Sequence, residues 1–580
     1  VSFGWRMAGH GLAVRRFRKK GVIMQIKRLI VLLICLSLSL TALFGCEKAP
    51  THSLPGDEEL DVSYANKITA ENPLIWSDVP DPDVIRVGDT YYMVSTTMYY
   101  TPGVPIMRSY DLVNWELIGY VYDTLEDSQQ TELFGDSHAY GKGSWAASIR
   151  YHEGMFYVLF CAWDQGKSYI YKTEDIENPE WTRYVFDRVF HDASLFFEDD
   201  GTPYVVYGVG DVYIIEFEKD CSSVKPGGVD QLLFNTGLAE GLSGAEGIHF
   251  YKIDGRYYGT MISYATNVPG VARCETCYRA DSLLGPYEGK VVLCDTMGYY
   301  GNGVAQGGIV MTPEGYWYAL LFQDHGAVGR IPNLQPVTWE DGWPMMGEDG
   351  KAVVNVTVDS NQSEWSETTL MSDDEFDYSE NKLRLEWQFN HNPDNSYWSV
   401  TERPGYYRIT TSKTVSDIFH ARNTLTQRME GPASTAEVLL DVSGLNPGDY
   451  AGISAFQTNA GMVGVYVRED GSKMVYFAKQ TRNGEQEIRQ EESLEGDTVY
   501  LKIEYLFSTV NEDGSMTTED NAKFYYSLDG ESWTKLSKGF SMTYDLDLFT
   551  GYRTALYCYS TASAGGHADF DYYRVTKSER

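Results

Sequence analysis

Five stretches of the sequence repeat one pattern, and this pattern decides the fold. They read DPDVIRVGDTYYMV (81–94), WAASIRYHEGMFYVLF (145–160), DASLFFEDDGTPYVVY (192–207), EGIHFYKIDGRYYGTM (246–261) and QGGIVMTPEGYWYALL (306–321). Each contains a short strand, a glycine turn and a second strand rich in aromatic residues. Repeats of about 40–60 residues, each long enough for four strands, are typical of β-propellers. The sequence therefore predicts a five-bladed β-propeller over residues 71–360; a β-sandwich with coincidental hairpins is the alternative.

The repeats align on their turn glycines, which are Gly88, Gly154, Gly201, Gly255 and Gly315. The residue that opens the repeat lies nine positions before the glycine in four repeats and seven before it in the first, where the turn is two residues shorter. These opening residues are Asp81, Trp145, Asp192, Glu246 and Gln306. Because the innermost strand of a propeller blade starts at the central channel, these five residues should converge there. Three of them are carboxylates, and like charges in one place cannot all ionise freely. Such a group suits acid–base chemistry, although a cation bound in the channel is an alternative.

Composition excludes some classes of function. The 580 residues carry 47 basic and 82 acidic side chains, a net charge of −35. Nucleic-acid binding needs clustered lysine and arginine, so no nucleic-acid partner is expected. Aromatic residues make up 14% of the chain, which suits strand-rich folds and surfaces on which sugar rings stack.

A second domain is predicted over residues 361–580. Stretches such as LRLEWQFNHNP (383–393) and KFYYSLDGESWTKL (523–536) alternate apolar with polar residues and are separated by turn signals. This pattern is typical of an antiparallel β-sandwich of the jelly-roll or concanavalin-like kind. It does not repeat the pattern of the first domain.

The N-terminal part of the chain reads as an export signal. Residues 24–28 are a short basic segment, and Leu29–Phe44 is an apolar run of 16 residues without charge. This run is short for a membrane span and fits a signal peptide. It ends at Cys46 in a pattern that resembles a bacterial lipobox, so we expect lipidation of Cys46 and an exported lipoprotein, periplasmic or at the cell surface. The lipid would anchor the protein in the outer or inner membrane. An uncleaved N-terminal anchor is the alternative. Residues 1–23 precede Met24, where we expect translation to start. Residues 47–70 are predicted to form a linker.

The six cysteines beyond Cys46 are scattered through the chain: Cys161, Cys221, Cys274, Cys277, Cys294 and Cys558. A single C-x-x-C pair, Cys274 and Cys277, has no second pair or histidine cluster nearby, which argues against zinc. We expect buried thiols or one incidental disulfide.

Two carboxylates on either side of a glycosidic bond are the basic equipment of a glycosidase. The sequence resembles glycoside hydrolase family 43, whose members are five-bladed β-xylosidases and α-L-arabinofuranosidases. The resemblance is to the subgroup that carries a sandwich domain. Residues 80–83 (PDPD), 191–196 (HDASLF) and 245–251 (AEGIHFY) match the family's three motifs in order. The resemblance implies that Asp81 is the general base, Asp192 the residue that raises the pKa of the acid, and Glu246 the general acid.

Further resemblances imply binding roles. Trp145 and Ala146, in the segment GSWAAS (143–148), match a segment that lines the sugar pocket, and Arg330 matches an arginine that contacts sugar hydroxyls. Gln306 stands where many members have a histidine near a channel calcium, which implies a structural calcium nearby.

The resemblance also implies a function. It implies an inverting exo-glycosidase that removes terminal α-L-arabinofuranose or β-D-xylose from plant hemicellulose or pectic side chains, with no cofactor required for the chemistry. Its partners would be an oligo- or polysaccharide and, through the lipid, a membrane; the sequence sets no oligomeric state. A non-catalytic glycan-binding propeller lipoprotein is the alternative.

Overall fold

The computed structural model describes residues 64–578, except 240, 267, 269, 300–301, 512–515 and 546. These residues are almost entirely β-structure, with three short 3₁₀ turns, η1 (Thr236–Leu238), η2 (Gly326–Val328) and η3 (Ile418–His420). None of the helical segments in this part of the chain is long and apolar enough to cross a membrane. The predicted signal peptide, Cys46 and residues 47–63 of the predicted linker lie outside the described residues.

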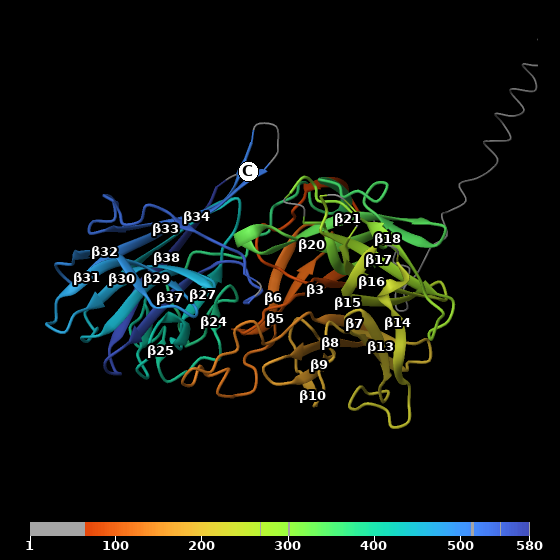
Figure 1. Ribbon diagram of the computed structural model, residues 1–580, viewed down its shortest axis with the longest axis horizontal. Helices are drawn as coiled ribbons and strands as arrows, with labels where there is room; N and C mark the ends of the chain where they lie inside the picture. Colours follow the sequence, from red (N-terminus) through yellow and green to blue (C-terminus); the bar gives the residue numbers. More distant parts are fainter. Residues whose placement is uncertain are drawn as a thin grey trace, which may run out of the picture. The chain divides into compact units, whose positions relative to one another are not determined.

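The first domain is a five-bladed β-propeller, as predicted, and its blades run from red to green in Figure 1. Each blade is an antiparallel sheet of four strands. Blade I has β2 (Asp83–Val87), β3 (Thr90–Val94), β5 (Gly103–Ser109) and β6 (Trp115–Tyr122), and blade II has β7 (Ser148–His152), β8 (Met155–Ala162), β9 (Lys167–Thr173) and β10 (Thr182–Phe186). Blade III has β11 (Ser194–Phe197), β12 (Pro203–Tyr207), β13 (Asp211–Glu216) and β14 (Asp230–Asn235). Blade IV has β15 (Leu242–Ile253), β16 (Arg256–Ala265), β17 (Arg273–Ala280) and β18 (Glu288–Leu293), and blade V has β19 (Ala305–Met311), β20 (Trp317–Asp324), β21 (Arg330–Glu340) and β22 (Trp343–Met346).

The turn glycines explain why the repeats align so well. Each lies between the first and second strands of its blade and has a positive φ, from 65° at Gly88 to 85° at Gly315. Glycine adopts this left-handed conformation without the steric cost that a side chain brings. The same tight turn therefore recurs in every blade and fixes where the inner strand ends.

The blades close into a ring around the channel. The first strands of neighbouring blades contact one another in the order β2, β7, β11, β15, β19 and back to β2. Apolar side chains from blade V, such as Leu320, pack with those of blade I, such as Val84, in one buried cluster. Burial of these apolar surfaces is the main force that holds adjacent blades together.

Strand β1 (Asn66–Glu71) corrects the predicted linker. It pairs antiparallel with β23 (Asn355–Ser360), the last strand before the second domain. Ile68 and Ala70 are buried in the cluster shared by blades I and V. Residues 66–70 therefore belong to the folded domain; their two apolar positions are too few to show a strand period in the sequence.

The second domain is a β-sandwich of two antiparallel sheets, as predicted. One sheet has, in order, β32 (Glu487–Ser493), β31 (Lys473–Thr481), β30 (Asn459–Val467), β29 (Asp449–Phe456), β37 (Arg553–Ser560), β27 (Leu425–Arg428), β24 (Gln388–Asn390) and β4 (Tyr100–Thr101). The other has β25 (Trp398–Ser399), β26 (Tyr407–Thr410), β38 (His567–Lys577), β28 (Ala433–Asp441), β33 (Thr498–Val510), β34 (Met516–Ser527) and β35 (Thr534–Lys535), and β36 (Phe540–Ser541) also pairs with β34. Strand β4 comes from blade I of the propeller, so the two domains share a sheet.

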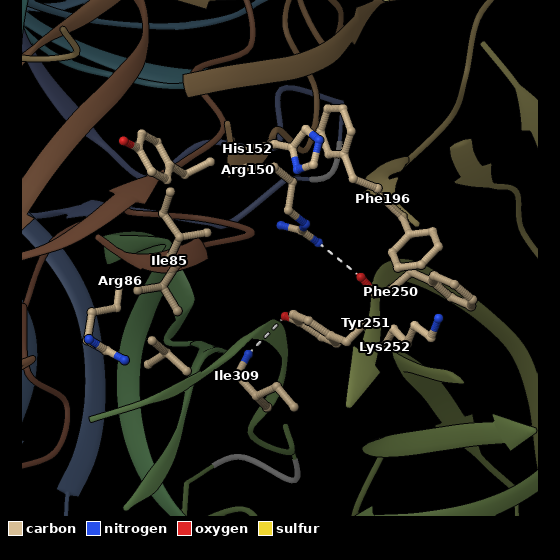
Figure 2. Close-up of a pocket in the computed structure, with 13 residues that line it drawn as sticks. Ile85, Arg86, Arg150, His152, Phe196, Phe250, Tyr251, Lys252 and Ile309 are labelled. Atoms are coloured by element: carbon tan, nitrogen blue, oxygen red, sulfur yellow. Dashed lines mark hydrogen bonds between the residues drawn. The ribbon is translucent and has the colours of Figure 1, made fainter. Parts of the chain in front are cut away.

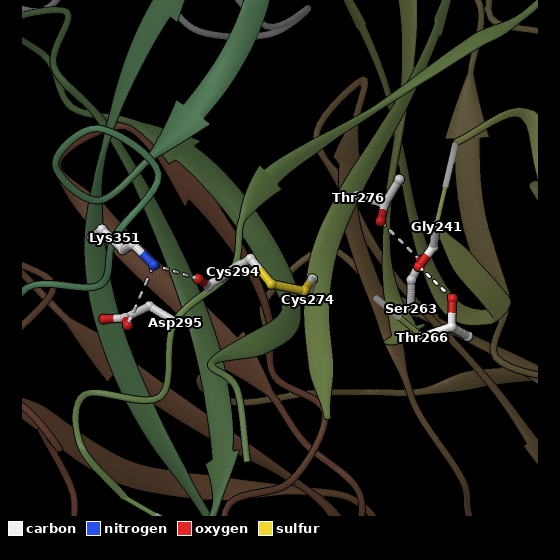
Figure 3. Close-up of a disulfide and its surroundings, with 8 residues drawn as sticks. All are labelled: Gly241, Ser263, Thr266, Cys274, Thr276, Cys294, Asp295 and Lys351. Atoms are coloured by element: carbon white, nitrogen blue, oxygen red, sulfur yellow. Dashed lines mark hydrogen bonds and ion pairs between the residues drawn. A yellow bond between two sulfur atoms is a disulfide. The ribbon is translucent and has the colours of Figure 1, made fainter. Parts of the chain in front are cut away.

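Cys274 and Cys294 form a disulfide between β17 and the end of β18 (Figure 3). The other cysteines among the described residues, Cys161, Cys221, Cys277 and Cys558, are buried free thiols. This outcome confirms the expectation of buried thiols with one disulfide. Cys274 and Cys277 do not act as a pair because residues three apart on a strand point to opposite faces.

Candidate active site

Three of the five residues that open the blades share a left-handed backbone conformation. Asp81, Asp192 and Gln306 have positive φ values of 52°, 46° and 55°. Each such residue costs roughly 1–3 kcal/mol and is typical of functional sites. In blade IV the left-handed residue is Gly247, directly after Glu246, with φ 66°. A Cβ at Gly247 would lie 2.4 Å from Cδ of Gln306, so only glycine fits beside the neighbouring blade.

Asp81 is buried and held by two hydrogen bonds. Oγ1 of Thr96 donates to Oδ2 at 2.7 Å, and Nη1 of Arg330 donates to Oδ1 at 2.7 Å. The Asp81 side chain is only 8% exposed. These bonds fix the orientation of the carboxylate while each oxygen keeps a lone pair for another donor.

Arg330 is a fixed cation at the bottom of this group. Its Nε donates to Oδ1 of Asp324 at 3.2 Å, and Asp324 also accepts from Arg273. Although burial opposes its charge, Tyr544, Asp81 and Asp324 raise the pKa of Arg330 further above its usual range. Two carboxylates and two arginines are thus linked in one network, and this network favours the charged form of Arg330.

Asp192 and Glu246 meet on the other side of the group, with His191 between them. One ligand-type atom from each of the three side chains lies within 4.8 Å of the other two. Tyr264 donates a hydrogen bond to Oε1 of Glu246 at 3.1 Å. Oδ1 of Asp192 is buried and has no hydrogen-bond partner among the described residues. The structure therefore brings together the three carboxylates that the repeat register singled out.

The two carboxyl groups share one proton near neutral pH. Burial, together with the charges of Glu246 and Asp81, raises the pKa of Asp192 to about 7. Burial also opposes ionisation of Glu246, but His191, Tyr264 and Arg330 outweigh it and lower the pKa of that group. The pKa of Asp192 is therefore higher than that of Glu246, whereas we expected Glu246 to hold the proton in the free pocket. The reason is that the positive charges of His191 and Arg330 act on Glu246 and stabilise its ionised form, which the sequence does not show.

An aromatic wall lines the group, and part of it comes from the sandwich. The ring centroid of Trp145 lies 5.4 Å from that of His191 and 5.2 Å from that of Phe549. The guanidinium of Arg330 lies 5.7 Å from the Phe549 ring. Ala146 is half-buried beside Trp145 and gains no contact of its own that points to a role. Aromatic rings gathered in this way suit contact with the apolar face of a sugar ring.

Gln306 lies beside Gly247, the residue that follows Glu246. Its backbone N donates to Oε2 of Glu275 at 2.7 Å, and Oε1 of Glu275 is buried with no hydrogen-bond partner in the described part of the chain. Burial raises the pKa of Glu275 to about 8. A carboxylate oxygen and an amide oxygen are hard ligands that calcium prefers. The unpartnered Oε1 of Glu275 is thus the oxygen at this point that could serve a calcium ion as a ligand.

The far end of the channel holds a separate pocket of about 90 Å³ (Figure 2). Its lining comes from the later residues of the same inner strands, among them Arg86, Arg150 and Tyr251. Arg150 pairs with the buried Asp83 at 2.6 Å, and His249 contacts the other oxygen of Asp83 at 3.0 Å. None of the five opening residues lines this pocket, so the candidate site is confined to one end of the propeller.

Several contacts at the site escaped the sequence analysis. Thr96, Tyr264 and Asp324 lie on strand ends or loops that carry no repeat signal. His191 stands in a quoted motif, next to Asp192, yet nothing in the sequence shows that it reaches Glu246. Phe549 lies more than 200 residues from the propeller repeats, and only the three-dimensional fold brings it to Trp145.

Comparison with known proteins agrees with the fold. The model of glycosyl hydrolases family 43 matches residues 70–344, and that of the beta-xylosidase C-terminal concanavalin A-like domain matches residues 373–576. The chain is 30% identical over 471 residues to a putative beta-xylosidase of Xylanibacter ruminicola, with 80% of this chain and 82% of that protein covered. It is 32% identical over 377 residues to the non-reducing end alpha-L-arabinofuranosidase BoGH43B of Bacteroides ovatus, with 60% and 66% covered.

A solved structure described as a bifunctional GH43-CE protein of Bacteroides eggerthii has a TM-score of 0.80 and 41% identity to this chain. The match covers 89% of this chain and 64% of that one, so this chain spans less than two thirds of that protein. Fold, domain order and sequence matches agree across both domains. The chain is a glycoside hydrolase and belongs to glycosyl hydrolases family 43.

Proposed function

We propose that the protein is an inverting exo-glycosidase that removes terminal α-L-arabinofuranose or β-D-xylose from plant hemicellulose or pectic side chains. The observation that carries this proposal is the gathering of Asp81, Asp192 and Glu246 beside Arg330 at one end of the channel. Relatives named for both pentoses support the substrate class. A non-catalytic glycan-binding role is not favoured, because the chain belongs to a hydrolase family and retains all three carboxylates.

In the proposed mechanism Asp81 is the general base. It accepts a proton from a water molecule, which attacks the anomeric carbon as the glycosidic bond breaks. Arg330 and Thr96 already satisfy one lone pair on each oxygen of Asp81, so the carboxylate is oriented before the water binds. Orientation of this kind removes much of the entropic cost of the attack.

Glu246 is the general acid that gives its proton to the leaving oxygen. In the free pocket the proton of this pair lies on Asp192. The proposed productive form has it on Glu246, with Asp192 ionised. The negative charge of Asp192 favours this form because two carboxylates so close cannot both ionise easily. Trp145, Phe549 and Arg330 hold the sugar ring.

Hydrolysis of two 4-nitrophenyl glycosides, the α-L-arabinofuranoside and the β-D-xyloside, tests the proposal directly. The wild-type protein should hydrolyse at least one of them, and Asp81→Asn should reduce that rate at least 10³-fold, as expected for loss of the base (~10²–10⁴). An unchanged rate in Asp81→Asn would overturn the assignment of the base. The ratio of the two wild-type rates decides between the pentoses.

We further propose that the protein is an exported lipoprotein anchored through Cys46, periplasmic or at the cell surface. The disulfide between Cys274 and Cys294 supports export, since disulfides persist in oxidising compartments. Cell fractionation of the full chain and of Cys46→Ala tests this. The wild type should be found with membranes and the variant in the soluble fraction; equal distribution would contradict lipidation.

A structural calcium held near Gln306 and Glu275 is also proposed. Positive charge at this point would compensate a buried carboxylate that otherwise takes up a proton. The ion would stabilise the junction of blades IV and V and take no part in the chemical steps.

A further inference from the structure

His191 lies between the two carboxyl groups that share a proton. Its Nδ1 is 3.7 Å from Oδ1 of Asp192, and its Nε2 is 4.0 Å from Oε2 of Glu246. The side chain is 19% exposed. Both distances are too long for hydrogen bonds, yet they are short enough for a strong charge interaction in a buried site.

Two indole rings hold the imidazole in this place. The ring centroid of His191 lies 5.4 Å from that of Trp145 and 5.7 Å from that of Trp163. Its backbone carbonyl accepts a hydrogen bond from the N–H of Gly208 at 3.1 Å. The two indoles also contact each other, with centroids 6.2 Å apart, so the ring is held by one aromatic cluster and by its backbone, with its two nitrogens facing the two carboxyls.

The charged groups around His191 come from four elements. Asp192 precedes β11, Glu246 lies in β15, Asp81 precedes β2, and Arg330 lies in β21 and acts on both members of the pair. Burial opposes a charge on the imidazole, but Glu246, Asp192 and Asp81 outweigh it and raise the pKa of His191. These carboxylates therefore favour the charged form of the ring.

We propose that His191 is a positioning residue that opposes Asp192: its positive charge draws the shared proton off Glu246, whereas the negative charge of Asp192 drives the proton onto Glu246. His191 and Asp192, which are neighbours in sequence, thus shift the pKa of Glu246 in opposite directions. The pH at which the pair loses its proton depends on both residues. This inference rests on the proposed role of Glu246 as general acid.

The sign of the effect distinguishes this role from a structural one. A nearby cation lowers the pKa of a carboxyl group, by about 1–3 units at such distances. Removal of the cation therefore raises the pKa of the pair. Since activity needs the proton, the alkaline limb of kcat/KM, which reports the free enzyme, should move to higher pH.

The test is the pH profile of kcat/KM for a natural oligosaccharide in wild type, His191→Gln and His191→Lys. We expect the alkaline limb of His191→Gln to lie about 1 unit higher than in wild type. His191→Lys keeps a cation at this position and should return the limb toward the wild-type pH. His191→Asn serves as a second neutral variant, and thermal unfolding shows which variants are folded.

The matched control is His152→Gln. His152 is also largely buried and stacks on Phe197 with centroids 4.3 Å apart, but it lines the pocket at the far end of the channel. Its substitution should leave the limb unmoved. A limb that stays in place or moves to lower pH in folded His191→Gln and His191→Asn would overturn the inference.

Failure of this inference is distinguishable from failure of the proposed function. If Glu246 is not the acid, Glu246→Gln will lose natural and activated substrates equally. If Glu246 is the acid and His191 only fills space, Glu246→Gln will keep its selective loss while the His191 variants lower kcat without moving the limb.

Discussion

Phe549 of the β-sandwich packs against Trp145 of the propeller, with ring centroids 5.2 Å apart. The sandwich therefore completes the wall of a site whose carboxylates all come from the propeller. The same domain takes strand β4 of blade I into one of its sheets. Substrate binding should thus depend on the second domain, although no charged group of the chemistry belongs to it.

Phe549→Ala tests this dependence. Loss of the aromatic contact should lower kcat/KM by about 3- to 10-fold, mainly through KM, because such contacts contribute about 0.5–1.5 kcal/mol. Steady-state kinetics on an aryl pentoside measures the change. Tyr110→Ala removes an aromatic ring that is 49% exposed in blade I and should leave both constants unchanged. Equal effects of the two substitutions would mean that Phe549 does not line the sugar site.

Glu246→Gln should separate substrates by their leaving groups. Natural glycosides need a proton on the leaving oxygen, so their turnover should fall about 10²- to 10⁴-fold. Activated aryl glycosides leave without this help and should retain most of their rate. The measurement is kcat on an arabino- or xylo-oligosaccharide and on a 2,4-dinitrophenyl pentoside. A loss of the same size on both would refute the acid role.

The pH dependence of the wild type and of Asp192→Asn follows from the shared proton. Activity needs this proton, which the pair loses as the pH rises through about 7. In Asp192→Asn the acid stands alone with a pKa below its ordinary value, because His191, Tyr264 and Arg330 stabilise its charge. The alkaline limb of kcat/KM should therefore move to lower pH by about two units or more, given an ordinary glutamate pKa near ~4.3. An unmoved limb would contradict the coupling of the two carboxyls.

The repeats were readable from the sequence because their turns require a left-handed residue in every blade. Gly88 and its four counterparts set the alignment, in which Asp192 and Glu246 open their repeats nine residues before the glycine and Asp81 opens its repeat seven residues before it. Tyr264 and Phe549 could not be found in this way, since contacts across domains and strand ends carry no period. The sequence also could not predict that the pKa of Asp192 is higher than that of Glu246. This difference depends on how closely His191 and Arg330 approach Glu246, which only the three-dimensional structure shows.

Calcium removal gives a test of the proposed ion. A ligand present at about 100 times its Kd stabilises a protein by about 2.7 kcal/mol, and at roughly 2–4 °C per kcal/mol this is a Tm change of about 5 °C or more. Chelation with EGTA should lower the Tm by this amount, and added calcium should restore it. Glu275→Gln should abolish the difference between the two conditions. An unchanged Tm of the wild type in EGTA would argue against an ion at Gln306.

The central claim is that Asp81 activates a water on the face of the sugar opposite to Glu246. Proton NMR of the first sugar released, recorded before the anomers equilibrate, tests it most directly. We predict inversion: the β anomer from an α-L-arabinofuranoside, or the α anomer from a β-D-xyloside. First release of the anomer with the substrate's own configuration would show a covalent intermediate on a carboxylate and contradict the assignment of Asp81 as a base.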